Sequence, residues 1–167
     1  MKIIKYPGRE EWSSLIKRPA LDVTTLFDTV RTVLDKVREQ GDTAVKAYEE
    51  KFDKVLLSSL QVSEEEMREA DALVAEDLKQ AIRTAKANIE KFHASQRFEG
   101  KKVETTPGVT CWQKAVAIEK VGLYIPGGTA PLFSTVLMLA VPARIAGCKE
   151  IVLCTPPNRE GKVHPAI

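Results

Sequence analysis

The sequence predicts an α/β protein in which a helical N-terminal segment precedes an incomplete parallel α/β unit. Two observations lead to this fold class. Residues 1–100 hold 17 of the 25 Lys and Arg residues and 19 of the 23 Asp and Glu residues, with helical spacing of their apolar positions. Residues 101–167 are apolar and rich in glycine and proline, and their pattern changes to strand, turn, helix and strand. We therefore expect two parts, divided near residue 100.

The composition is typical of a soluble globular protein. The 167 residues suffice for one or two domains with a hydrophobic core, and 44% are hydrophobic and 29% charged. A net charge of +2 gives no sign of a nucleic-acid or anionic membrane partner. The longest apolar block, residues 136–141, is too short to span a bilayer. Three cysteines without a CxxC pair are typical of reduced thiols, so we expect a cytoplasmic protein.

The first helices are predicted from the residues that begin and end them and from the helical spacing of apolar positions. A short helix near Trp12 must stop near Pro19, because the residue before a proline is driven out of the helical region. A threonine at 24 or 25 can cap a second helix, which Gly41 ends. The second helix has the apolar stripe Leu26, Val30, Val33, Leu34 and Val37.

Two further helices follow before residue 100. Asp42 can cap a helix that places Val45, Tyr48 and Phe52 on one face. Ser63 with Glu66 has the spacing of a capping box, and a long amphipathic helix follows. Its apolar stripe is Leu78, Ile82, Ala85, Ile89 and Phe92, and its opposite face carries Glu76, Lys79, Arg83 and Lys91.

The second part changes to the period of strands. Alternation through Val109, Cys111, Val116 and Ile118 predicts half-buried strands. Residues 121–125 and 150–154 are predicted to be buried strands.

Residues 132–146, between the two buried strands, form an apolar helix that we expect to be buried on most sides. Pro142 must kink this helix or begin a second one, and Gly147 stops it. The order strand, helix, strand predicts two parallel strands joined by a crossover.

A candidate ligand site lies where these two strands end. In parallel α/β sheets, ligands bind beyond the carboxyl ends of the strands, where loops 126–129 and 155–158 are expected to be neighbours. Gly127 and Gly128 would allow close approach, and Tyr124 could stack on a ligand or donate a hydrogen bond. The alternative is an ordinary turn with a packed tyrosine. GxGxxG and Walker sequences are absent, which disfavours a standard pyrophosphate cradle but leaves other nucleotide sites open.

The remaining reactive side chains give weaker indications. Cys111 and Cys154 could be nucleophiles, but the apolar context and the lack of a nearby histidine favour structural burial. His93 is expected to be a C-terminal helix partner, and His164 precedes Pro165 without companions that would form a site. We therefore expect no complete zinc site in these residues. Because two strands and one crossover leave a sheet incompletely covered, we expect the N-terminal part of a larger protein.

The sequence also resembles a known family. The run VGLYIPGGTAPLFSTVLMLAVPARIAGCKEIVLCTPP, residues 121–157, closely resembles the N-terminal half of the histidinol dehydrogenases. The resemblance is collinear and covers almost the whole chain. It extends to the segments at 17–20, 37–55, 88–96 and 103–113.

This resemblance implies a zinc enzyme that oxidises L-histidinol to L-histidine through the aldehyde, using two NAD in succession. It also implies a homodimer. Residues 101–167 would be the first part of a Rossmann-like, aldehyde-dehydrogenase-like NAD-binding domain, which is truncated here. Tyr124, Pro126 and Pro156 match residues of the family's cofactor cleft. The family's catalytic Glu-His pair and its zinc ligands fall beyond residue 167. We thus expect no catalytic or metal residues here, and an inactive fragment.

Two other functions stay open at this point. The chain could be a stand-alone, non-catalytic module for dinucleotide binding or assembly. It could also be an aldehyde dehydrogenase relative with a cysteine nucleophile, which requires a reactive thiol at Cys111, Cys148 or Cys154.

Overall fold

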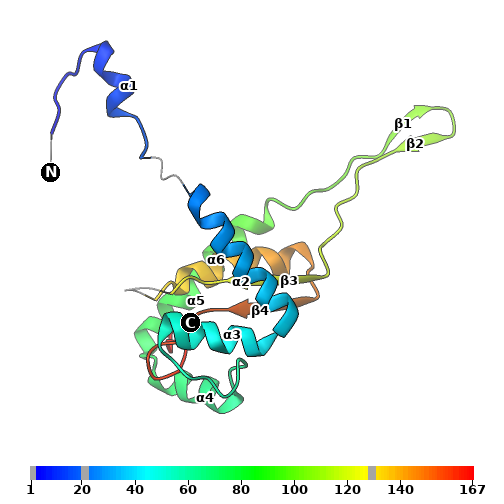
Figure 1. The fold of residues 1–167 in the computed structure, drawn as a ribbon. Helices are drawn as coiled ribbons and strands as arrows, with labels where there is room; N and C mark the ends of the chain where they lie inside the picture. Colours follow the sequence, from blue (N-terminus) through cyan, green and yellow to red (C-terminus); the bar gives the residue numbers. More distant parts are fainter. Residues whose placement is uncertain (1–2, 20–22, 128–130) are drawn as a thin grey trace. The chain divides into compact units, whose positions relative to one another are not determined.

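The computed structural model describes residues 3–19, 23–127 and 131–167, and it has the predicted α/β fold (Figure 1). The chain forms two compact units, Met1–Ala44 and Val45–Ile167. These units differ from the predicted division into a helical segment, 1–100, and a Rossmann-like domain, 101–167. That division stays a prediction.

In the described residues of the first unit, helices α1 and α2 are each entered through a tight turn. The 3₁₀ turn η1 (Arg9–Glu11) leads into α1 (Trp12–Leu15), and η2 (Thr24–Leu26) leads into α2 (Phe27–Gln40). The predicted threonine cap is wrong, because the 3₁₀ turn places Leu26 at the N-cap of α2. Gly41 ends α2 as predicted, with a φ of 55° and its N–H donating to the Val37 carbonyl at 2.8 Å.

Helix α3 (Asp42–Tyr48) crosses the boundary between the units and continues as a π-helical turn, η3 (Glu49–Asp53). The rings of Tyr48 and Phe52 stack with centroids 5.6 Å apart, which confirms that these two residues share a face. The predicted long helix is preceded by a separate one. Helices α4 (Glu64–Leu73) and α5 (Glu76–Ala94) are distinct, because Val74 adopts an extended conformation between them.

The centre of the second unit is the predicted strand–helix–strand element. Strand β3 (Lys120–Tyr124) pairs in parallel with β4 (Glu150–Cys154), with Tyr124 opposite Cys154. Helix α6 (Phe133–Ala146) connects them, contacts β3 and packs against α5. Gly147 ends α6 in the left-handed conformation, as predicted.

Helix α6 differs in part from expectation. It continues through Pro142, so no second helix begins there, and the alternative of a kink stays a prediction. Burial on most sides is also not found, since Val141 is the buried residue of α6 and Met138 is 58% exposed. Leu139 is also 37% exposed, so α6 leaves apolar side chains accessible.

A β-hairpin precedes the parallel strands. Strands β1 (Val103–Thr106) and β2 (Val109–Cys111) pair antiparallel around Gly108, whose φ is 83°. The second half of the predicted alternation is wrong. Val116 and Ile118 are 78% and 72% exposed, and they belong to no strand of the described chain. Alternation alone does not provide the neighbouring strand that pairing requires.

Candidate functional site

The loops that leave β3 and β4 touch each other. The ladder continues one residue beyond β3, where the Ile125 N–H donates to the Cys154 carbonyl at 2.9 Å and the Ile125 side chain is fully buried. The Pro156 ring then packs on Gly127, where an added Cβ would lie only 2.7 Å from the proline Cγ. The predicted proximity of the two loops is therefore confirmed at Gly127 and Pro156.

The side chains expected at this edge are accessible. Tyr124 is 62% exposed and Pro126 is exposed, whereas Pro156 is half-buried. Within the described residues the Tyr124 side chain is therefore not packed, and its role in binding a ligand stays a prediction. Gly128 and Thr129, also expected in this loop, lie outside the described residues.

The chain after Pro156 folds into a compact turn closed by Asn158. Its side-chain Oδ1 accepts hydrogen bonds from the backbone N–H of Glu160 at 3.1 Å and of Lys162 at 2.9 Å. Its own N–H donates to the Lys162 carbonyl at 2.8 Å. Gly161 has a φ of 77°, which such a turn accommodates more easily with glycine than with other residues.

Two carboxylates of α4 hold the end of this turn. The Val163 N–H donates to Glu66 Oε1 at 2.9 Å in a partly buried position, and Lys162 forms an ion pair with Glu69. The hydrogen bond to Glu69, aided by its negative charge, raises the pKa of Lys162 above its ordinary value. We call Glu66, Glu69, Lys162 and Val163 the α4 clasp.

Sequence reasoning missed the α4 clasp because Glu66 has another plausible role. Half of the predicted capping box is present, since Ser63 Oγ accepts from the Glu66 N–H at 3.1 Å. The Glu66 carboxylate, which a capping box would return to the N-cap, accepts instead from Val163. A local spacing rule contains no signal for a partner 97 residues away.

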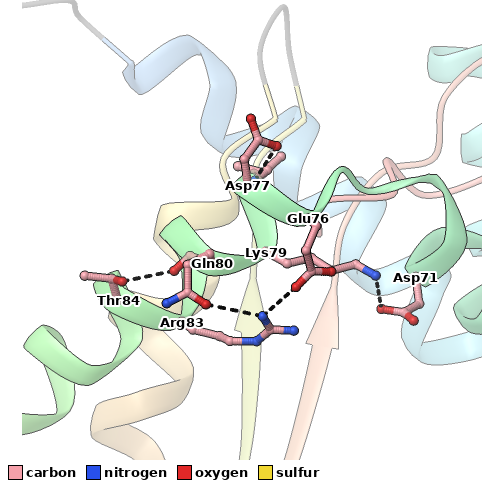
Figure 2. A network of polar contacts seen from close by, with 8 residues as sticks. Asp71, Glu76, Asp77, Lys79, Gln80, Arg83 and Thr84 are labelled. Atoms are coloured by element: carbon pink, nitrogen blue, oxygen red, sulfur yellow. Dashed lines mark hydrogen bonds and ion pairs between the residues drawn. The ribbon is translucent and has the colours of Figure 1, made fainter.

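The charged side chains at the start of α5 form one ion pair with α4 and one within α5. Figure 2 shows Lys79 paired with Asp71 of α4 at 3.0 Å, and Arg83 paired with Glu76 at 2.8 Å. Arg83 also donates to Gln80 at 3.5 Å. Glu76, Lys79 and Arg83 of the predicted polar face are thus balanced in ion pairs without a ligand.

The cysteines differ from expectation. Cys111 and Cys154 are exposed, so the prediction of structural burial is wrong for both. Cys111 lies in a hairpin without a covering layer, and Cys154 lies on the open face of the alternating strand β4.

The two histidines make local contacts. His93 lies in the last turn of α5, with Nδ1 2.7 Å from Gln96 Oε1. His164 Nδ1 accepts from the Ala166 N–H at 3.2 Å.

One carboxylate of η3 has an unusual environment. Oε2 of Glu49 is buried and finds no hydrogen-bond partner within the described residues. Burial, followed by repulsion from Asp53, raises the pKa of Glu49 above its ordinary value.

Two features are absent from the described part of the chain. No cluster of three or more His, Cys, Asp and Glu side chains there has the geometry to hold a metal ion. Among the same residues, no helix combines the length and apolar character needed to cross a membrane.

The parallel β3–α6–β4 element, with two touching loops at the carboxyl edge of its strands, defines the class as an α/β protein, a class in which ligands bind beyond that edge. A family model for histidinol dehydrogenase matches residues 16–167. The chain belongs to the histidinol dehydrogenase family. This confirms the resemblance to the N-terminal portion of that family.

Individual relatives agree with this assignment. A histidinol dehydrogenase of Bacteroides thetaiotaomicron is 69% identical over all 167 residues, and one of Shigella boydii is 50% identical over 149 residues, or 89% of the chain. The chain spans 39% and 34% of the length of these two relatives. The crystal structure of histidinol dehydrogenase from Elizabethkingia anophelis superimposes with a TM-score of 0.91 at 51% identity, covering 96% of this chain and 37% of that one.

Proposed function

We propose that these residues belong to an enzyme that oxidises L-histidinol to L-histidine through the aldehyde with two NAD, and that they form part of its NAD site. Family membership supports the reaction, which makes the protein an oxidoreductase of histidine biosynthesis. The observation that carries the cofactor site is the contact between Gly127 and Pro156 at the carboxyl edge of the sheet, beside an exposed Tyr124.

Each residue at this edge has a distinct role in the proposal. Bound NAD would accept a hydride from the substrate carbon. The Tyr124 ring, 62% exposed, offers a surface for stacking and a hydroxyl for hydrogen bonding. Pro126 and Pro156 form rigid walls, since a proline ring fixes φ and adds little entropy loss on binding. Gly127 allows the two walls to approach.

Zinc does not fit the described residues, because they contain no suitable cluster of ligands. We propose that the zinc ligands and the catalytic Glu-His pair lie outside these 167 residues, as the family resemblance implies. The 167-residue chain alone is then inactive. A homodimer and a cytoplasmic location are further parts of this proposal. The alternative of a stand-alone binding or assembly module is not favoured by the family assignment.

The cofactor role of Tyr124 can be tested in the complete gene product. Tyr124→Ala is expected to raise the KM for NAD roughly tenfold through loss of stacking, and Tyr124→Phe only a few-fold. The KM for histidinol should stay constant. NADH formation during histidinol oxidation is the readout. An unchanged KM for NAD in Tyr124→Ala would contradict the assignment, and wild-type protein that forms no NADH would contradict the proposed reaction.

A further inference from the structure

The structure assigns Glu66 and Glu69 of α4 as positioning residues for the loop that carries Pro156. This inference rests on the proposed function, because it concerns the wall of the same NAD site. Neither carboxylate lies at the sheet edge. They act on the edge through the chain that follows β4.

The first support is the continuity of hydrogen bonds from the sheet edge to α4. The Ile125 N–H to Cys154 bond fixes the start of the loop after β4. Asn158 then closes a turn with two hydrogen bonds to the Lys162 backbone and one from the Glu160 N–H. The next residue, Val163, donates its N–H to Glu66. The loop is thus held at both ends, with Pro156 between the two attachments.

The second support is the surface on which the turn rests. A Cβ added at Gly161 would lie 3.4 Å from Leu57 Cδ2 and 3.5 Å from Val55 Cγ1. Val55 is only 5% exposed, so the turn rests on a buried position of the helical segment. Figure 1 shows the C-terminal turn, coloured red, beside α4.

The two carboxylates contribute unequally. The Glu66 bond is partly buried and has a charged acceptor, and such hydrogen bonds are stronger than neutral ones. The ion pair of Glu69 is half exposed, and exposed pairs contribute little. The N-cap at Ser63 also holds the backbone N–H of Glu66. Glu66 is therefore the main positioning residue and Glu69 the minor one.

An ordered loop presents Pro156 to the cofactor before binding. If the α4 clasp is broken, the cofactor must order the loop itself, which weakens binding in the ground state and the transition state alike. The expected signature is a higher KM for NAD with unchanged kcat. The KM for histidinol should not respond.

Three substitutions in the complete gene product test this. Glu66→Ala removes the acceptor and is expected to raise the KM for NAD about tenfold. Glu66→Gln keeps an oxygen that can accept from Val163, so it should restore most of the affinity. Glu64→Ala is the matched control, since it removes a charge from the same helical turn outside the clasp, and it should match the wild type.

Each outcome decides the question. An unchanged KM for NAD in Glu66→Ala overturns the inference, as does a parallel change in both KM values and kcat. If Glu66→Ala fails to fold, Lys162→Met replaces it, and a rise in the KM for NAD of about twofold supports the inference while no rise overturns it.

A separate readout covers failure of the proposed function. If the wild-type protein forms no NADH, amide hydrogen exchange at Ile125 and Asn158 is compared between Glu66→Ala and Glu64→Ala. If exchange is faster in Glu66→Ala but not in Glu64→Ala, the α4 clasp positions the loop even though the proposed reaction fails. Equal exchange in the two variants overturns the positioning role.

Discussion

The contact between Gly127 and Pro156 gives a prediction that can be worked out atom by atom. In Gly127→Ala the new Cβ would lie 2.7 Å from Pro156 Cγ, about 0.7 Å inside the shortest ordinary contact of 3.4 Å. A proline ring cannot rotate away, so the two loops must separate. We expect a cost of about 1 kcal/mol, the low end for overpacking, because Gly127 is exposed.

The assay is amide hydrogen exchange at Ile125, whose N–H bonds to Cys154 at the base of the two loops. A cost of this size corresponds to roughly fivefold faster exchange. Gly122→Ala is the matched control in β3, since no atom lies within 4 Å of its added Cβ, and it should leave exchange unchanged. The effect is thus specific to the loop contact.

A double-mutant cycle isolates the cause. Pro156→Ala removes the ring carbons Cγ and Cδ, so the nearest remaining contact of the new Cβ at 127 is 3.4 Å. The combined Gly127→Ala and Pro156→Ala protein should therefore recover most of the lost protection, with a coupling of about 1 kcal/mol. An equal cost of Gly127→Ala with and without the proline ring would refute the reasoning.

Three further predictions concern other parts of the chain. At pH values above 7, Glu49→Gln should raise the free energy of unfolding by a few tenths of a kcal/mol. Because the folded pKa of Glu49 is raised, this gain should vanish below its ordinary value of 4.5, and Glu50→Gln is the control. Gly100→Ala should displace the base of the β1–β2 hairpin, seen as altered NMR shifts of the hairpin amides, because its Cβ would lie 2.0 Å from the Gln113 carbonyl oxygen. Gly41→Ala should cost about 1–2 kcal/mol in urea unfolding through backbone strain alone, since its φ is 55° and nothing lies within 4 Å.

The sequence was informative where local pattern determines structure. Apolar runs bounded by glycine and proline predicted β3, α6 and β4 within about one residue. Parallel pairing then predicted that Gly127 lies near Pro156, because the carboxyl ends of parallel strands share an edge. The cofactor roles of Tyr124, Pro126 and Pro156 stay predictions.

The failures arise where a partner distant in sequence decides the outcome. Glu66 has the spacing of a capping residue, yet its carboxylate accepts a hydrogen bond from the Val163 N–H. Val116 and Ile118 alternate like a strand but have no neighbouring strand in the described chain. Cys111 was expected to be buried, whereas its hairpin is exposed along both strands. In each case, short-range spacing cannot specify what covers a side chain.

The long separation in the α4 clasp also has a consequence for the order of folding. Contacts between distant residues require closure of a large loop, whose entropy cost opposes them until much of the chain is ordered. Helices α4 and α5 need only local contacts, whereas the Glu66–Val163 bond spans 97 residues. During synthesis from the N-terminus, α4 therefore leaves the ribosome long before its partner exists. The α4 clasp can therefore close only after Val163 has emerged, late in the synthesis of these residues.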